Sequence, residues 1–289
     1  MQSNKPLTLT HRGLEPSNPD FYPESSYEAF KDHLERGFGI EFDVNFAKDG
    51  LIVFHDSDLN RITKGDNKSL FSELGLEEIK KIRYGKNENG RFITFKGLLS
   101  LIRNCSSEIN ALHLKGKYQT EFYLNLLINA LEKDILNKIF IFDVKPEIAV
   151  YLKSKIKELS LAPSVSHSYD ILRFNECVGK TLFSIEDAIK YKKEGLYDWV
   201  WMDEWDLSDK NGKEKKLYTK ENFDALKKAG YKIGLVTPEM HTTSPGLYGG
   251  ESHPDAKDKE TLFKRIKEII NLNPDAICTD NPEEVREIL

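Results

Sequence analysis

Short apolar runs rich in β-branched and aromatic residues alternate with longer amphipathic stretches along the chain. The runs are typical of strands, and the stretches repeat apolar residues at the three- to four-residue spacing of helices. Strands are predicted at 7–13, 39–44, 111–115, 139–144, 164–168, 199–205, 232–238 and 275–280. Helices are predicted at 25–37, 94–104, 121–133, 147–159, 184–195, 219–230 and 259–272. This alternation over 289 residues predicts an α/β fold, a (β/α)8 TIM barrel, in one domain spanning 1–289.

Three segments depart from the simple alternation. The run at 51–56 is predicted to pair antiparallel with the strand at 39–44 through a short Lys-Asp-Gly turn. The segments 206–219 and 239–259 are longer than a barrel loop needs, and both follow predicted strands. Because loops after the strands lie on the catalytic face of a TIM barrel, 239–259 is a candidate lid. The equal alternative is a surface loop without a role in function.

The composition is that of an ordinary globular protein, with 31% charged residues, 39% hydrophobic residues and a formal net charge of −5. Both signs of charge are mixed along the chain, so nothing indicates a nucleic-acid partner or an anionic membrane surface. No apolar run has transmembrane length, and the first residues lack the apolar core of a signal peptide. Cys105, Cys177 and Cys278 are widely spaced and odd in number, which predicts free thiols and a cytoplasmic protein.

Histidine gives the first indication of a site. Five of the seven histidines lie at or just beyond the C-terminal end of a predicted strand, where barrel active sites are built. These five are His11, His55, His113, His167 and His241. The other two, His33 and His253, lie in a predicted helix and in the long loop. A single histidine is usually structural, but five at one rim favour a shared site.

Two carboxylates, Glu41 and Asp43, alternate in an otherwise apolar strand and therefore share one face of it. Close carboxylates repel each other unless a cation or a proton lies between them. Oxygen ligands of this kind suit Mg²⁺ or Ca²⁺. The alternative is a buried ion pair of Glu41 with Arg12 or Lys115, which does not account for both acids and for the adjacent His55-Asp56 pair.

Several segments together resemble the glycerophosphodiester phosphodiesterase family, a branch of the PLC-like phosphodiesterases. The resemblance rests on His-Arg-Gly at 11–13, Glu-x-Asp at 41–43 and His-Asp at 55–56, with further matches at 23–30 and 279–282. It implies a barrel enzyme of the PLC-like type that cleaves phosphodiesters with one divalent metal ion. By this resemblance, His11 and His55 would be the general base and acid on either side of the phosphorus. Arg12 and Lys115 would bind the phosphate, and Glu41 and Asp43 would ligate the metal.

The charge of a phosphodiester gives these roles a physical basis. The anion repels an incoming nucleophile until a metal ion, Arg12 and Lys115 neutralise it. The leaving alcohol needs a proton and the attacking oxygen must lose one, and two imidazoles of near-neutral pKa perform both transfers. Asp56 either orients the ring of His55 or caps the following turn.

The chain departs from the family pattern on the third and seventh strands. His113 stands where the family usually has a third acidic metal ligand, two residues before the lysine. As a ligand it would shift the preference toward Mn²⁺ or Zn²⁺; the equal alternative is that it binds substrate. On the seventh strand the family's Trp-Thr pair is absent, and Glu239 and His241 bring polar groups for substrate binding instead.

The strand ends also carry Asp143, Asp203 and Glu239, which predicts a pocket more polar than glycerol alone requires. A sugar phosphate or another polyhydroxy diester would use these carboxylates as hydroxyl acceptors; the alternative is that they cap loops. Of three tryptophans on the sixth strand, two are predicted to pack the barrel and helix layer and Trp205 to stack at the rim.

The leading hypothesis is a metal-dependent hydrolase of a small phosphodiester, either a glycerophosphodiester or a sugar-phosphate diester. One divalent ion is expected, Mg²⁺ or Ca²⁺, with Mn²⁺ or Zn²⁺ if His113 is a ligand. One alternative is a lyase in which a hydroxyl of the substrate attacks and a cyclic phosphate forms. The other is a barrel that binds phosphate or sugar without turnover. The sequence leaves open the alcohols of the substrate, the metal and the oligomeric state.

Overall fold

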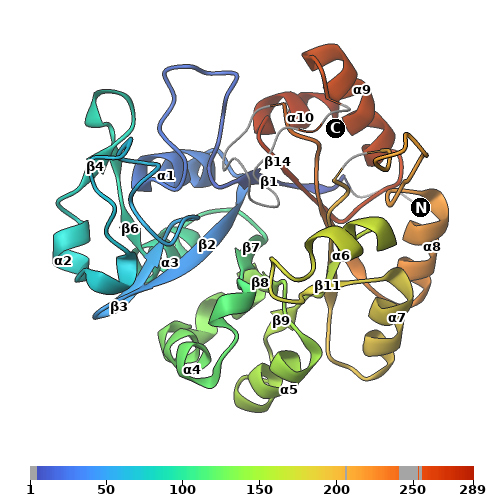
Figure 1. Ribbon diagram of the computed structural model, residues 1–289, viewed down its shortest axis with the longest axis horizontal. Helices are drawn as coiled ribbons and strands as arrows, with labels where there is room; N and C mark the ends of the chain where they lie inside the picture. Colours follow the sequence, from blue (N-terminus) through green and yellow to red (C-terminus); the bar gives the residue numbers. More distant parts are fainter. Residues whose placement is uncertain (1–4, 206, 241–252, 254–255) are drawn as a thin grey trace.

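The computed structural model describes residues 5–205, 207–240, 253 and 256–289. Parallel strands form its centre, and helices surround them on the outside (Figure 1). The strands lie in the order β11 (Leu182–Phe183), β10 (Ser164–Val165), β12 (Trp199–Met202), β13 (Lys232–Val236), β14 (Ala276–Thr279), β1 (Leu7–His11), β2 (Gly39–Ala47), β7 (Asn110–His113), β8 (Ile139–Phe142) and β9 (Ser160–Leu161).

The two ends of this order meet at the segment 160–165. On one side, β9 pairs with β8. On the other, β10 pairs with β12, and the carbonyls of Leu161 and Pro163 accept hydrogen bonds of 3.0 Å from Asp198 N and Trp201 N. The sheet therefore closes into a barrel, and the predicted TIM-barrel fold is confirmed.

The fifth strand differs most from its prediction. It begins earlier, at Ser160, and is divided by Pro163, which has no N–H to donate to a neighbouring strand. It also ends before His167, because helix α6 (Ser168–Phe174) starts there. The short strand β11 pairs with β10 beside the division and is not predicted from the sequence.

All seven predicted helices are present. They are α1 (Tyr27–Glu35), α3 (Phe95–Arg103), α4 (Glu121–Ala130), α5 (Pro146–Lys155), α7 (Ile185–Lys193), α8 (Lys220–Lys228) and α9 (Lys259–Ile270). Five of them begin at a side chain that accepts a hydrogen bond from a first-turn amide: Ser26, Thr94, Ser184, Thr219 and Asp258. The sequence missed the shorter α2 (Leu76–Ile79), α6 and α10 (Pro282–Ile288), which have too few turns for a clear apolar period.

Alternation along the strands separates two apolar layers. Outward residues of β2, such as Phe42, pack against the helices, where Phe42 meets Phe95 of α3. Inward aromatic residues stack inside the barrel: the ring centroids of Phe140 and Trp199 are 4.7 Å apart, and those of Phe142 and Trp201 are 4.2 Å apart. Both tryptophans therefore belong to the barrel interior, which they fill below the C-terminal mouth.

An insertion between the second and third barrel strands packs beside the barrel (Figure 1). It contains β3 (Gly50–Val53), α2, β4 (Arg83–Tyr84), β5 (Gly90–Arg91) and β6 (Ile93–Thr94). Its own apolar cluster consists of Ile52, Phe54, Leu59, Phe71, Ile79, Tyr84 and Phe92. The predicted hairpin is present, since β3 pairs antiparallel with β2, but the sequence predicted no unit beyond it.

Candidate active site

The C-terminal ends of the strands surround a cavity of about 790 Å³. Its lining includes the predicted site residues His11, Arg12, Glu41, His55, His113, Lys115 and Glu239. Asp43 is buried, and its carboxylate is 2.8 Å from His113 Nδ1 and 3.1 Å from Lys115 Nζ. His241 lies outside the described residues. Eight of the nine predicted site residues therefore converge on one mouth.

The hairpin brings His55 back to the barrel. Strand β2 continues past the barrel rim, and β3 returns beside it, so that Phe54 N donates to Asp43 O at 3.1 Å. Asn45 Nδ2 fixes the return by donating to the carbonyls of Phe54 and Asp56 at 2.5 and 2.7 Å. His55 thereby reaches the level of the second-strand acids although it follows no barrel strand.

Asp56 orients the ring of His55. His55 Nδ1 is 2.7 Å from Asp56 Oδ1, and Arg61 Nε donates to the other oxygen of Asp56 at 2.6 Å. Burial, followed by the charges of Arg12 and Lys115, holds the pKa of His55 well below its ordinary value. The imidazole of His55 is therefore neutral at neutral pH.

His11 has the opposite environment. Its Nδ1 is 2.8 Å from Glu239 Oε1 and 3.0 Å from Asp280 Oδ1. Burial by itself lowers the pKa of His11, but the two carboxylates outweigh burial and the repulsion from Arg12, and the pKa is raised well above its ordinary value. His11 and His55 therefore differ in charge: the imidazole of His11 is the cation and that of His55 is neutral.

The turn after β1 places Arg12 in the cavity wall. Arg12 has a φ of 52° and Gly13 a φ of 71°. A left-handed non-glycine residue costs about 1–3 kcal/mol and persists where its surroundings fix it, here through Arg12 N to Glu41 O at 3.2 Å. A side chain at Gly13 would also come within 3.2 Å of Ala29 Cβ. The buried guanidinium lies 3.7 Å from Glu24 Oε2 and 3.8 Å from Asp43 Oδ2.

Glu41, Asp43 and His113 form a group that can hold a metal ion. One ligand atom of each lies within 4.8 Å of the others. Among the described residues, Glu41 Oε2 and Asp43 Oδ2 have no hydrogen-bond partner, although both side chains are buried. Burial, with the nearby charge of Asp43, raises the pKa of Glu41 to about 7. Two buried carboxylates with unused oxygens fit a hard divalent cation.

The buried ion pair weighed as an alternative for Glu41 forms at Asp43 instead. Lys115 Nζ lies 3.1 Å and Arg12 Nε 3.8 Å from the Asp43 carboxylate, whereas Glu41 has no ion pair within the described part of the chain. The pKa of Asp43 is held well below its ordinary value, because Lys115 and the neighbouring histidines outweigh burial. Of the two acids on the second strand, Glu41 is therefore the one without an ion-pair partner among the described residues.

His113 contacts carboxylates through both ring nitrogens. Nδ1 is 2.8 Å from Asp43 Oδ1, Nε2 is 3.2 Å from Asp143 Oδ2, and the ring stacks on Phe142. Burial alone lowers the pKa of His113, but hydrogen bonds to Asp143 and Asp43 raise it to about 9. Ligation of a metal by His113 would require one of these contacts to open. Asp143 Oδ2 also accepts from Thr181 Oγ1 at 2.8 Å, so this oxygen is already used within the protein.

The sequence of this chain matches a known protein family, and its fold matches solved structures. Residues 11–284 match the model of the glycerophosphoryl diester phosphodiesterase family. The chain belongs to this family. It is therefore a phosphoric diester hydrolase, and the resemblance found in the sequence is confirmed. No curated protein sequence matches it.

Several solved structures share the fold of this family member. A Galdieria sulphuraria protein assigned to the glycerophosphodiester phosphodiesterases superposes with a TM-score of 0.70 at 18% identity, over 100% of this chain and 99% of that chain. An Oleispira antarctica phosphodiesterase in complex with the product sn-glycerol-3-phosphate gives 0.65 at 17% identity, over 98% and 96%. A glycerophosphoryl diester phosphodiesterase from Parabacteroides distasonis gives 0.63 at 19%, over 99% and 87%. At such identities these likenesses establish the fold.

Two histidines of this phosphodiesterase differ from their sequence-based assignment. His167 Nδ1 accepts from Tyr169 N at 3.2 Å and caps α6, so its position at the rim is explained by a structural role. His253, which the sequence left in the long loop, lines the cavity, and its Nδ1 accepts from Glu239 N at 2.8 Å. No sequence motif marks His253.

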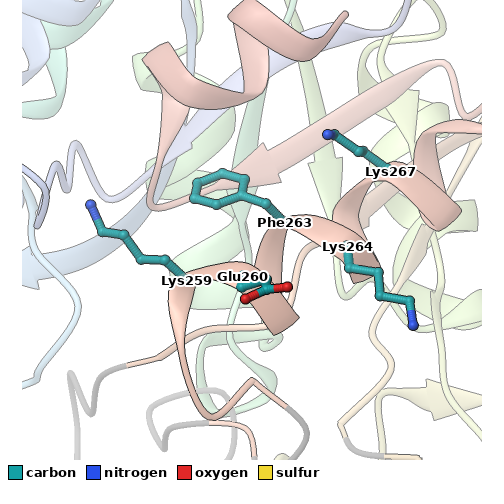
Figure 2. A pocket seen from close by; sticks show the side chains of 5 residues that line it. All are labelled: Lys259, Glu260, Phe263, Lys264 and Lys267. Carbon is teal, nitrogen blue, oxygen red and sulfur yellow. The ribbon is translucent and has the colours of Figure 1, made fainter.

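A second hollow, of about 530 Å³, lies on α9 and shares no lining residue with the cavity at the strand ends. Figure 2 shows that the side chains of Lys259, Lys264 and Lys267 around it point in different directions. All three are exposed, and only Phe263 in this hollow is partly buried. It offers no converging polar groups, so the candidate active site is the cavity at the mouth.

The structure bears on two further expectations. No helix in the described ranges is long and apolar enough to cross a membrane. Cys105, Cys177 and Cys278 are all unpaired, as their spacing predicted.

Proposed function

We propose that this phosphodiesterase hydrolyses a glycerophosphodiester or sugar-phosphate diester, with His55 as general base and His11 as general acid. The observation that carries the proposal is the pair of buried imidazoles at one cavity, one neutral (His55) and one cationic (His11), next to the unsatisfied carboxylates of the second strand. The product named for the Oleispira antarctica relative, sn-glycerol-3-phosphate, agrees with a glycerophosphodiester substrate. We further propose that residues 1–289 act as one catalytic domain. The cytoplasmic location stays a prediction.

A divalent metal ion would be held by Glu41 and Asp43, with His113 proposed as the third ligand. When bound, the ion neutralises charge on the phosphoryl oxygens and lowers the barrier to attack. Mg²⁺ and Ca²⁺ suit the two carboxylates, and Mn²⁺ or Zn²⁺ suit a site that includes the imidazole.

The protein's own groups would carry the proton transfers. Neutral His55, with Nδ1–H held by Asp56, takes a proton from the attacking water. Cationic His11, held by Glu239 and Asp280, gives a proton to the oxygen of the leaving alcohol. Arg12 and Lys115 would bind the phosphate oxygens. Their ion pairs with the Asp43 carboxylate hold both side chains at the cavity.

The direct test is an assay of the purified protein with glycerophosphodiesters and sugar-phosphate diesters in the presence of Mg²⁺, Ca²⁺ or Mn²⁺. Phosphorus NMR of the products separates a phosphate monoester, expected for hydrolysis, from the cyclic phosphate of a lyase. Tight ligand binding by calorimetry without any product would instead support a binding barrel.

The charge on His11 gives a pH prediction. Because Glu239 raises the pKa of His11, Glu239→Gln is expected to lower that pKa and to move the alkaline limb of the kcat/KM profile to lower pH by about one unit. The acid limb, which follows His55, is expected to stay in place. Glu221→Gln on the exposed face of α8 serves as the matched control. An alkaline limb that does not move in folded Glu239→Gln protein would contradict the assignment of His11 as acid.

A further inference from the structure

Asp143 has an unusual backbone conformation at the edge of the cavity. It follows directly after β8, lines the cavity and has a φ of 68°. A left-handed conformation is uncommon for a residue with a side chain and persists where the surroundings fix it. Here Gln119 Nε2 donates to Asp143 O at 2.6 Å, and Lys145 N donates to Gln119 Oε1 at 3.1 Å. The backbone therefore sets the direction in which the Asp143 carboxylate leaves β8.

The Asp143 carboxylate lies against one ring nitrogen of His113. Asp143 Oδ2 is 3.2 Å from His113 Nε2, and it also accepts a hydrogen bond of 2.8 Å from Thr181 Oγ1. Asp143 is only 6% exposed, and Thr181 is fully buried. Because a carboxylate only accepts hydrogen bonds, the contact requires Nε2 of His113 to carry a hydrogen.

The other ring nitrogen of His113 faces the proposed metal ligands of the second strand. Nδ1 is 2.8 Å from Asp43 Oδ1, and one ligand atom of His113 lies within 4.8 Å of one of Glu41 and one of Asp43. The ring stacks on Phe142, with centroids 4.8 Å apart and planes inclined by 9°. An imidazole nitrogen that ligates a metal carries no hydrogen, and the tautomer with its hydrogen on Nε2 leaves Nδ1 free. The two nitrogens of His113 thus have separate partners, the metal site and Asp143.

We propose that Asp143 is a positioning residue for metal binding: it holds the Nε2–H of His113 and thereby directs Nδ1 toward the metal site on the second strand. The proposal rests on the metal site of the proposed function. A histidine that ligates a metal commonly donates its other N–H to a carboxylate, which fixes the tautomer and the ring orientation. When metal binds, the contact between Nδ1 and Asp43 opens, and the contact between Nε2 and Asp143 remains. This role differs from the hydroxyl acceptor or loop cap that the sequence predicted for Asp143.

Asp143→Asn tests this role and keeps the backbone, because asparagine adopts the left-handed conformation more readily than most residues. Its amide can donate to His113 Nε2, which favours the tautomer with the hydrogen on Nδ1. Calorimetric titration of metal-free protein is expected to show binding of Mn²⁺ and Zn²⁺ weakened by about 10- to 100-fold. Thr181→Val removes the hydroxyl that donates to Asp143 and is expected to weaken binding by a smaller factor. Asp224→Asn on the exposed face of α8 is expected to keep the wild-type affinity.

A double-mutant cycle with His113→Ala separates positioning from a general effect on the fold. If Asp143 acts through His113, Asp143→Asn adds no further loss of Mn²⁺ or Zn²⁺ affinity in the His113→Ala background. A second loss of the same size in that background would overturn the inference. NMR of isotope-labelled histidine in the Zn²⁺-loaded wild type gives the tautomer directly and does not depend on the folding of a variant. The His113 signals, identified by their absence in His113→Ala, are expected to show a hydrogen on Nε2 and none on Nδ1.

These measurements do not depend on turnover. The expected affinities and tautomer, found in a protein that hydrolyses none of the tested diesters, support the inference and reject only the proposed function. Unchanged Mn²⁺ and Zn²⁺ affinity in folded Asp143→Asn protein, or a hydrogen on Nδ1 of His113 in the Zn²⁺-loaded wild type, rejects the inference and leaves the proposed function standing. A wild type that binds no divalent ion rejects both the inference and the proposed metal dependence.

Discussion

His55→Ala is expected to lower kcat/KM by about 10²–10⁴-fold on every diester, because it removes the neutral imidazole that is proposed to accept the proton of the attacking water. His11→Ala is expected to lose a similar factor on diesters with an aliphatic leaving alcohol. With a p-nitrophenyl diester, His11→Ala should lose far less, since p-nitrophenolate leaves without a proton. Steady-state kinetics on the two substrate types therefore separate the acid from the base.

His167→Ala is the matched control for these variants. His167 caps α6 and does not line the cavity, so its loss should cost about 1 kcal/mol of stability and leave kcat/KM nearly unchanged. The double variant His11→Ala/His55→Ala should fall well short of the product of the two single losses, because the residues act as a unit. Activity that survives in both single variants would contradict the two-histidine mechanism.

Removal of divalent metal with a chelator is expected to abolish hydrolysis, and addition of the native ion to restore it. Glu41→Gln removes one proposed ligand and is expected to cost several kcal/mol of transition-state stabilisation, which corresponds to about 10³-fold in rate. Without metal, the same variant should have a higher Tm than the wild type, because a buried carboxyl with a raised pKa beside Asp43 is replaced by a neutral amide. Metal should raise the Tm of the wild type and not that of Glu41→Gln.

Thermal unfolding and calorimetric titration with Mg²⁺, Ca²⁺, Mn²⁺ and Zn²⁺ measure these effects independently of activity. Glu221→Gln on the surface of α8 controls for the substitution itself. His113→Ala in the same titrations decides the third ligand: weaker binding of Mn²⁺ and Zn²⁺ is expected if His113 ligates. Full activity in chelated protein, together with full activity in Glu41→Gln, would refute metal dependence.

Sequence periodicity predicted neither the full insertion nor the different roles of the histidines at the rim. The hairpin of β2 and β3 was predicted from its turn, but the elements between Leu59 and Phe92 were not, because they are too short to repeat a pattern. The five rim histidines had equivalent positions in the sequence. In the structure His11, His55 and His113 enter the cavity, His167 caps a helix, and His241 lies outside the described residues.

The sequence by itself determined the alternation of strands and helices that makes the barrel, and it placed Glu41 and Asp43 on one face of the second strand. Both follow from the local period of side chains along a strand or helix. The tertiary structure alone decided the charges of the two imidazoles. His11 acquires its charge from Asp280, 269 positions away, and from Glu239, which become neighbours when the barrel closes. A pKa depends on burial and on charges within a few ångströms, whatever their separation along the chain, so residue pattern alone did not distinguish the acid from the base.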